Sequence, residues 1–158
     1  ATGKTLSEYA SEKLWQPIGA KENAFWSLDH DGGDELAYCC FNTNARDYAK
    51  FGYLYLNEGV VGEDTLIPNW YFKEATQPSP LLDKIGGPNK RYGYQWWCTS
   101  YKGESFFYAH GIDGQYILIL PESDLVVVRL GQTRPHIREK GHPIDIYEYL
   151  SMAQNMIR

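Results

Sequence analysis

Apolar residues in the first half of the chain recur every three to four positions, which is the spacing of amphipathic helices. This spacing predicts a helix over residues 5–16, where a threonine and a glutamate three positions later form a capping box. A second helix starts after Asn42 or Thr43, either of which can cap it, and stops before Gly59. A short third helix follows at Asn69–Ala75.

The second half of the chain has the pattern of β-strands, which alternate or run apolar between turn residues. Four strands are predicted, at Tyr92–Thr99, Glu104–Ala109, Gln115–Leu120 and Leu125–Leu130. A four-residue turn at 121–124 would join the last two as a hairpin. Helical spacing returns at about Ile144–Ile157. Helices, then an antiparallel sheet over about residues 92–130, then a covering helix make an α+β fold.

The composition is typical of a folded domain. The chain has 158 residues, enough for one domain with a real core, and 43% of them are hydrophobic. The net charge of −5 gives no reason to expect nucleic-acid or anionic-membrane binding. No apolar run approaches the ~20 residues of a membrane-spanning helix, and we expect no signal peptide at the N-terminus.

Cysteine and histidine usage predicts neither a disulfide framework nor a metal site. The chain has three cysteines, and we expect them to be small buried hydrophobic residues. The four histidines do not have the spacing of metal ligands. The acidic segment 29–35 lacks the ligand order and the final glutamate of a calcium loop. We therefore expect no metal and no cofactor.

Residues 110–115, His-Gly-Ile-Asp-Gly-Gln, join two of the predicted strands. Bracketing glycines let a main-chain N–H approach a ligand closely, and such a donor can stabilise the oxyanion of an acyl-transfer reaction. Alternatively, the glycines only form a turn or bulge. The chain contains neither Gly-x-Ser-x-Gly nor a serine followed three positions later by lysine. The sequence thus predicts one wall of a catalytic site and no nucleophile.

Five segments, in order, resemble the C-terminal part of serine β-lactamase-like hydrolases. They are Ala1–Tyr9, Trp15–Ala20, Asn42–Gly59, Tyr92–Trp97 and Gly111–Gln115. This family includes class C β-lactamases, D-alanyl-D-alanine carboxypeptidases, certain esterases and 6-aminohexanoate-dimer hydrolases. The resemblance covers nearly the whole chain. It implies that residues 1–158 are a single region, the C-terminal part of a β-lactamase-like domain without the N-terminal segment that carries the nucleophile.

The resemblance also implies the roles of residues in the segment 110–115. Aligned on Gly111, Ile112 would supply a main-chain N–H to the oxyanion hole, so its side chain need not take part in the chemistry. His110 matches either the histidine of a His-x-Gly motif or the threonine of a Lys-Thr-Gly motif. In both registers the cationic lysine that binds a substrate carboxylate in β-lactamases is absent, which argues against penicillin-type recognition.

The roles of several residues, in this segment and elsewhere in the chain, stay open. His110 can donate a hydrogen bond, carry a charge or be structural. Asp113 can bind a substrate amine, although we favour a solvent-facing role, and Tyr38 is a candidate substrate contact near the mouth of the cleft. Tyr55-Leu56-Asn57 spells the family's Tyr-x-Asn motif, but it falls on the last turn of a predicted helix, so we reject it.

The function predicted is part of a serine hydrolase that cleaves an amide or ester through an acyl-serine intermediate, with a β-lactam, a peptide or a related small molecule as substrate. The missing segment would bring Ser-x-x-Lys and Tyr-x-Asn, so this chain alone would be inactive. The alternative is a non-catalytic module that binds peptide or cell-wall fragments. An exposed sheet edge would permit a homo-oligomer. The resemblance suggests a periplasmic or extracellular protein.

Overall fold

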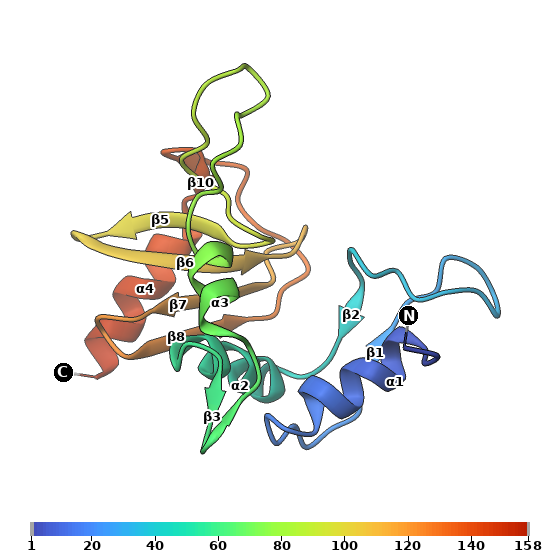
Figure 1. Ribbon diagram of the computed structural model, residues 1–158. Coiled ribbons are helices and arrows are strands. Elements are labelled where there is room, and N and C mark those ends of the chain that lie inside the picture. The colour runs from blue at the N-terminus through green and yellow to red at the C-terminus, as the bar shows by residue number, and fades with distance from the viewer. Residues whose placement is uncertain (1, 158) are drawn as a thin grey trace.

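A four-stranded antiparallel sheet lies at the centre of the computed structural model, which describes residues 2–157 (Figure 1). The strands are β5 (Trp97–Tyr101), β6 (Glu104–His110), β7 (Tyr116–Leu120) and β8 (Leu125–Arg129). Their order is β5-β6-β7-β8, so each strand pairs with the next in the chain. Together with the helices described below, this meander confirms the α+β prediction.

The strand register fixes the two turns at the ends of β7. His110 pairs with Tyr116, which leaves residues 111–115 as the turn between β6 and β7. Leu120 pairs with Leu125, so residues 121–124 form the predicted four-residue turn between β7 and β8. The candidate segment therefore lies at one end of the sheet, between two central strands.

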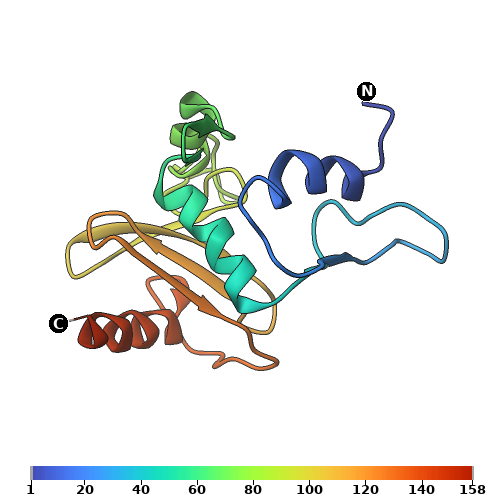
Figure 2. The ribbon, with the colours of Figure 1, turned by 90° about the horizontal axis from the view of Figure 1, so that it is seen from below.

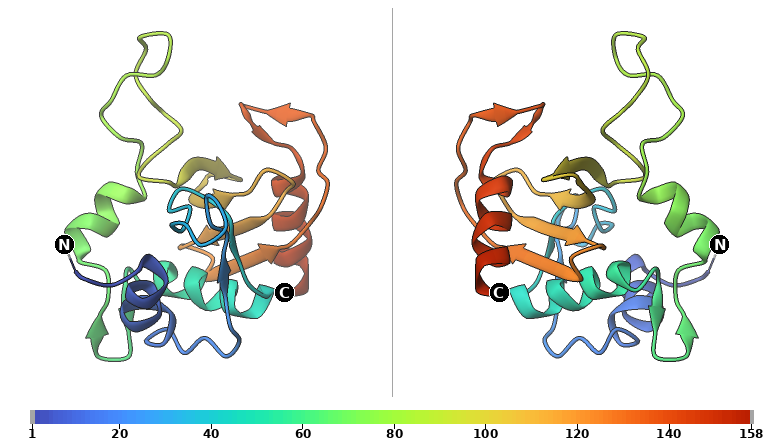
Figure 3. Two further views of the ribbon diagram at one scale, coloured as in Figure 1. Left: turned by 90° about the vertical axis from the view of Figure 1, so that its right-hand side faces the viewer. Right: turned by 90° about the vertical axis from the view of Figure 1, so that its left-hand side faces the viewer.

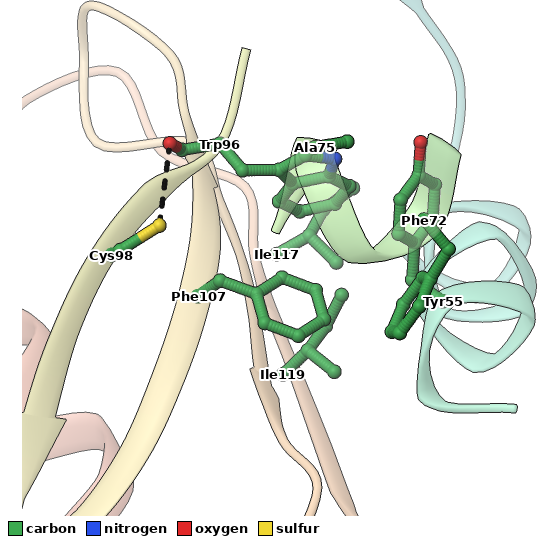
Figure 4. Close-up of a cluster of buried hydrophobic side chains, with 8 residues drawn as sticks. All are labelled: Tyr55, Phe72, Ala75, Trp96, Cys98, Phe107, Ile117 and Ile119. Atoms are coloured by element: carbon green, nitrogen blue, oxygen red, sulfur yellow. Dashed lines mark hydrogen bonds between the residues drawn. The ribbon is translucent and has the colours of Figure 1, made fainter. Parts of the chain in front are cut away.

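Two helices, α2 (Ala45–Leu56) and α3 (Asn69–Ala75), cover one face of the sheet (Figure 1). Their side chains and those of the sheet form one cluster, Tyr55, Phe72, Ala75, Trp96, Cys98, Phe107, Ile117 and Ile119 (Figure 4). Gly52 lets α2 approach β8 closely, because a Cβ there would lie 2.6 Å from the side chain of Val126. This face is a compact, mainly aromatic core.

The helix α4 (Asp145–Met156) covers the opposite face of the sheet (Figure 2). This second cluster consists of Phe106, Tyr108, Tyr116, Leu118, Leu120, Ile146 and Leu150. The final helix thus packs where the sequence predicts. Trp96 and Trp97 divide between the two faces as strand alternation requires, since Trp96 joins the first cluster and Trp97 packs against the second.

The N-terminal helix begins at the predicted capping box. The Thr5 hydroxyl accepts a hydrogen bond from the Glu8 N–H (3.1 Å), and the Glu8 carboxylate accepts one from the Thr5 N–H (2.9 Å). The α-helix α1 (Leu6–Ala10) then continues as the π-helix η1 (Ser11–Trp15). This segment lies to one side of the sheet (Figure 2).

The cap of α2 is not the residue expected. Asn44, rather than Asn42 or Thr43, accepts the Asp47 N–H (2.9 Å). The expectation was wrong by one or two positions because all three residues can cap, and the chain pairs Asn42 in a strand instead. Asp47 itself is buried and accepts the main-chain N–H groups of Lys21 (3.0 Å) and Glu22 (2.9 Å). It ties the end of the N-terminal helical segment to α2.

The predicted strand at 92–99 is only partly a strand. Residues 92–96 form turns, with Gln95 in the left-handed region (φ 67°), and β5 starts at Trp97. The aromatic residues at 92–96 suggested a strand, but aromatic residues are also common in buried segments that are not extended. The remaining strands are short pairs, β1 (Phe25–Trp26) with β2 (Phe41–Asn42), β3 (Val60–Val61) with β4 (Asp64–Thr65), and β9 (Arg138–Glu139) with β10 (His142–Pro143).

Two of the three cysteines differ from expectation. Cys98 is buried, as predicted, but Cys39 and Cys40 form a disulfide between neighbouring residues in the loop before β2. The prediction of burial rested on residue type alone. The loop that carries Cys39 and Cys40 lies beside the sheet and outside its core (Figure 3), so Cys39 is only half-buried and Cys40 is exposed. None of the described helices is long and apolar enough to span a bilayer.

Candidate functional site

The turn between β6 and β7 is held by its own main chain. The Gly111 N–H donates to the Gln115 carbonyl (2.8 Å), and the Gly114 N–H donates to the Gly111 carbonyl (3.2 Å). Gly114 adopts a φ of +82°, which favours glycine. A Cβ at Gly111 would lie 2.5 Å from the Gln115 side-chain oxygen. Both glycines are therefore required by the shape of this turn.

The side chains of Gln115, Arg129 and Arg134 hold further groups of the turn. Gln115 accepts the Asp113 N–H (3.1 Å) and donates to the Gly131 carbonyl (2.7 Å). Arg129 donates to the carbonyls of Asp113 and Gly114, and Arg134 donates to the Ile112 carbonyl (3.0 Å). The turn is thus anchored to the segment that follows β8, at residues 129–134.

Two main-chain donors of the turn stay available within the described residues, the Ile112 and Gln115 N–H groups, and Ile112 is the more exposed residue. The Ile112 N–H has no hydrogen-bond acceptor among residues 2–157, and the Ile112 side chain is 84% exposed. The neighbouring Gly111, Asp113 and Gly114 N–H groups are all used within the turn. Of the two unused donors, the Ile112 N–H lies on the exposed residue and can donate to an oxygen brought from outside.

His110, the last residue of β6, lies half-buried in an aromatic environment. Its ring centroid is 6.2 Å from those of Trp97 and Tyr108 and 5.3 Å from that of Tyr116. Burial, followed by the positive charges of Arg134 and Arg138, lowers the pKa of His110 to about 4. The imidazole is therefore neutral at pH 7, so it does not supply the missing cation.

A buried polar network lies behind His110, under α4. The Tyr108 hydroxyl and His142 Nδ1 are 2.8 Å apart, and the Tyr116 hydroxyl donates to an Asp145 carboxylate oxygen (3.2 Å). Burial, then the charges of Arg91 and Arg138, lowers the pKa of His142 to about 4. Two buried atoms, His110 Nε2 and Asp145 Oδ2, have no hydrogen-bond partner among the described residues.

The structure gathers some of the predicted residues and separates another. His110, Gly111, Ile112 and Asp113 are contiguous in the turn, and the Asp113 side chain is exposed, as the solvent-facing interpretation expects. Tyr38 lies elsewhere, on the extended loop before β2, where it is 79% exposed. No hydrogen bond or ring contact joins Tyr38 to the described turn residues.

Sequence reasoning missed the groups that approach from later in the chain. The position of Tyr108 could have been predicted, because side chains alternate along a strand and Tyr108 therefore lies on the same face of β6 as His110. His142 and Asp145 carried no such signal, since they meet their partners across 34 and 29 residues of sequence. No cluster of three or more His, Cys, Asp or Glu side chains within residues 2–157 is arranged to hold a metal ion.

A cavity of about 660 Å³ lies beside the edge strand β5, away from the turn. Its lining includes Thr99 and Ser100 of β5, Lys90 and Arg91 of the preceding loop, and Lys140 and His142. The turn residues 110–115 do not line it. This cavity is therefore separate from the candidate turn.

Comparison with known proteins gives one consistent relationship. The model of the beta-lactamase family matches residues 1–144. A structure from Bacillus anthracis, assigned provisionally as a 6-aminohexanoate-dimer hydrolase, superposes with a TM-score of 0.75 at 30% identity, over 99% of this chain and 38% of that one. A structure from Bacteroides dorei, assigned provisionally as a beta-lactamase, has a TM-score of 0.71 at 16% identity, over 98% and 53% of the two chains. This second likeness shows the fold alone.

Among curated sequences, an uncharacterised protein of Alkalihalophilus pseudofirmus is 28% identical over 132 residues, which are 75% of this chain and 38% of that protein. The chain thus spans about two fifths of the length of this relative and of the Bacillus anthracis protein.

Proposed function

The chain belongs to the beta-lactamase family, and on that premise we propose that it forms one wall of the active site of a serine hydrolase. In this proposal a serine hydroxyl attacks the carbonyl carbon of an amide or ester, and the Ile112 N–H donates to the oxyanion that forms. The oxyanion collapses to an acyl-serine and releases the amine or alcohol, and water then hydrolyses the acyl-serine.

The observation that supports this role is the unused Ile112 N–H, on an exposed residue of a turn whose carbonyls at 111–115 all accept hydrogen bonds. Because the donor is fixed before substrate arrives, it needs no reorganisation when charge develops on the substrate oxygen. Gly111 contributes by permitting the close approach of Gln115. We assign His110 a positioning role, since its neutral ring packs on Trp97 and Tyr116 at the point where β6 enters the turn.

The nucleophile in this proposal comes from polypeptide outside these 158 residues. The sequence contains no Ser-x-x-Lys, and the chain spans about two fifths of the Bacillus anthracis protein that it resembles at 30% identity. The outside segment would carry the attacking serine, the lysine that accepts its proton and a tyrosine that acts as acid or base. Residues 1–158 would then be the C-terminal part of the complete domain.

For the substrate, we propose a linear amide rather than a β-lactam. The neutral His110 supplies no cation for a substrate carboxylate. The nearby Arg129 and Arg134 guanidinium groups are already bonded to carbonyls of the turn. The 30% identical protein assigned provisionally as a 6-aminohexanoate-dimer hydrolase also supports a linear amide, and the exposed Tyr38 and Asp113 are the candidate substrate contacts.

The test compares the 158-residue chain with a protein in which a Ser-x-x-Lys segment precedes it. We expect the longer protein to react with a fluorophosphonate probe and to hydrolyse a linear amide dimer, and the chain alone to do neither. Nitrocefin and a p-nitrophenyl ester extend the assay to β-lactams and esters. Serine-dependent turnover by the chain alone would contradict the proposal. A longer protein that is folded but unlabelled would favour the non-catalytic binding module.

We further propose that the chain alone associates through the edge strand β8. Within the described residues β5 and β8 each pair with one strand, but the Cys98 N–H of β5 already donates to the Arg91 carbonyl (2.8 Å), so β8 is the more open edge. Light scattering should show a concentration-dependent dimer of the chain, absent from the longer protein. A strict monomer at high concentration would contradict this proposal.

A further inference from the structure

Residues 79–91 form a finger that projects from the molecule beyond the end of β10 (Figures 1 and 3). At its base the Ser79 N–H donates to the Tyr92 carbonyl (2.9 Å), and near its tip Leu82 and Pro88 form an isolated β-bridge. The finger contributes no residue to either core cluster. Its shape must therefore come from its own hydrogen bonds.

Two polar side chains shape the finger from within. The Asp83 carboxylate accepts the N–H groups of Ile85 (3.0 Å) and Gly87 (2.9 Å), and the Asp83 N–H donates to the Gly87 carbonyl (2.7 Å). Asn89 donates from its amide to the carbonyl and hydroxyl oxygens of Ser79 (3.2 and 3.0 Å). The negative charge of Asp83 is thus directed inward, and the tip is a preformed turn.

The tip presents apolar side chains to solvent. Leu81 is 71% exposed, Leu82 is 70% exposed and Ile85 is 84% exposed. Exposed apolar side chains gathered on one projection mark a surface that meets an apolar phase or partner.

Exposed cationic side chains lie on the finger and on the neighbouring β9–β10 hairpin. Lys84, Lys90 and Arg91 are exposed on the finger, and Arg138 and Lys140 are exposed on the β9–β10 hairpin. The two elements rise at the same end of the molecule (Figure 3), and Lys90, Arg91 and Lys140 line one cavity. With Asp83 and the exposed Glu139 counted, these two elements still carry an excess of positive charge in a chain whose net charge is −5.

We propose that the finger and the β9–β10 hairpin form a peripheral binding surface for bilayers that contain anionic lipid. Leu81, Leu82 and Ile85 enter the boundary between headgroups and acyl chains, and the lysine and arginine side chains lie against the anionic headgroups. A bilayer fits better than a protein partner because exposed apolar side chains and an excess of cationic side chains share one projecting end of the molecule. The negative net charge of the whole chain does not reveal the local excess of positive charge at this end of the molecule.

The test is cosedimentation of the 158-residue chain with vesicles, in 0.1 M NaCl. We expect binding to vesicles of phosphatidylcholine with about 30% phosphatidylglycerol, at least tenfold weaker binding to phosphatidylcholine alone, and weaker binding as salt rises. The triple variant Leu81→Ser, Leu82→Ser, Ile85→Ser should lower the affinity at least fivefold. The double variant Lys84→Gln, Lys90→Gln should do the same.

Matched controls separate the finger from a general effect of charge or apolarity. Met152→Ser with Ile157→Ser removes two exposed apolar groups elsewhere, and Lys21→Gln with Lys73→Gln removes two exposed cations elsewhere. Both pairs should bind vesicles like the unchanged chain, and circular dichroism should show that every variant is folded. Absence of binding, equal binding to both vesicle types, or equal losses in the finger and control variants would overturn the proposal. So would a dimer that only the finger variants abolish.

Discussion

The two faces of the central sheet bury different kinds of side chain. Under α2 and α3 the core is aromatic and aliphatic, apart from the Tyr55 hydroxyl and the Cys98 thiol (Figure 4). Under α4 the sheet also buries two tyrosine hydroxyls, two imidazoles and the Asp145 carboxylate. A buried polar group costs free energy unless it is hydrogen-bonded, and two atoms of this face have no described partner.

The two faces therefore differ in role: one mainly stabilises the fold, and the other lies next to the candidate site. The face under α2 and α3 stabilises the fold through apolar burial. The face under α4 includes the end of β6 that leads into the turn at 111–115, where His110 and Tyr116 pair across the strands. Polar groups are thus concentrated next to the candidate site. Three measurements test this separation, in order of decreasing effect.

Removing an aromatic ring from the apolar face should have the largest effect. Phe107 contacts the rings of Tyr55, Phe72 and Trp96, and Phe107→Ala should lower the free energy of unfolding by about 3–5 kcal/mol through lost transfer energy and a cavity. Denaturant unfolding measures it. The control Phe25→Ala, at a side chain 68% exposed, should change stability by less than about 0.5 kcal/mol. Equal losses of unfolding free energy in the two variants would show that the apolar face does not contribute more to stability than an exposed position.

Removing the main-chain donor at 112 should affect chemistry rather than stability. In the longer protein, Ile112→Pro deletes the N–H and should lower kcat by about 10²–10³, equivalent to about 2.7–4 kcal/mol of transition-state stabilisation. Ile112→Ala keeps the donor and should lose little, and His110→Ala should act mainly on KM. Circular dichroism checks the fold of each. A folded Ile112→Pro enzyme with nearly normal kcat would place the oxyanion hole elsewhere.

Acid should affect the polar face in a smaller and graded way. The pKa of His110 and that of His142 are each lowered from 6.5 to about 4, mainly by burial. Their contribution to stability is complete above pH 6.5 and is lost as pH falls from 6.5 towards 4, because the unfolded chain binds these protons first. Thermal unfolding between pH 4 and 7 should show this loss. His110→Gln with His142→Gln should flatten it, and an unchanged slope would assign the loss to other groups.

Sequence patterns identified the parts of the molecule that local physics determines. The capping box at Thr5, the turn at 121–124, the limits of α3 and the α+β order all follow from spacing and turn chemistry. The turn at 111–115 was also located correctly, because glycines between two strands have few other uses. Its proposed role in catalysis is still a prediction.

Other features depend on contacts that the sequence pattern does not encode. Which of three neighbouring polar residues caps α2 depends on the pairing of Asn42 with Phe25. The buried positions of His142 and Asp145 depend on how α4 and the loop before it close over the sheet. The disulfide between Cys39 and Cys40 contradicts a prediction made from residue type, since side-chain hydrophobicity does not report on loop geometry.

The buried Asp47 has a consequence for the order in which the molecule comes apart. Burial raises the pKa of its carboxyl group, but hydrogen bonds from Glu22, Lys50 and Lys21 outweigh burial and hold that pKa below its ordinary value of 3.8. The joint that these bonds form is therefore intact above pH 3.8 and weakens as acid protonates the carboxylate. As pH falls, the loss at His110 and His142 between pH 6.5 and 4 should therefore come first, and the contact between the N-terminal helical segment and α2 should weaken only below pH 3.8.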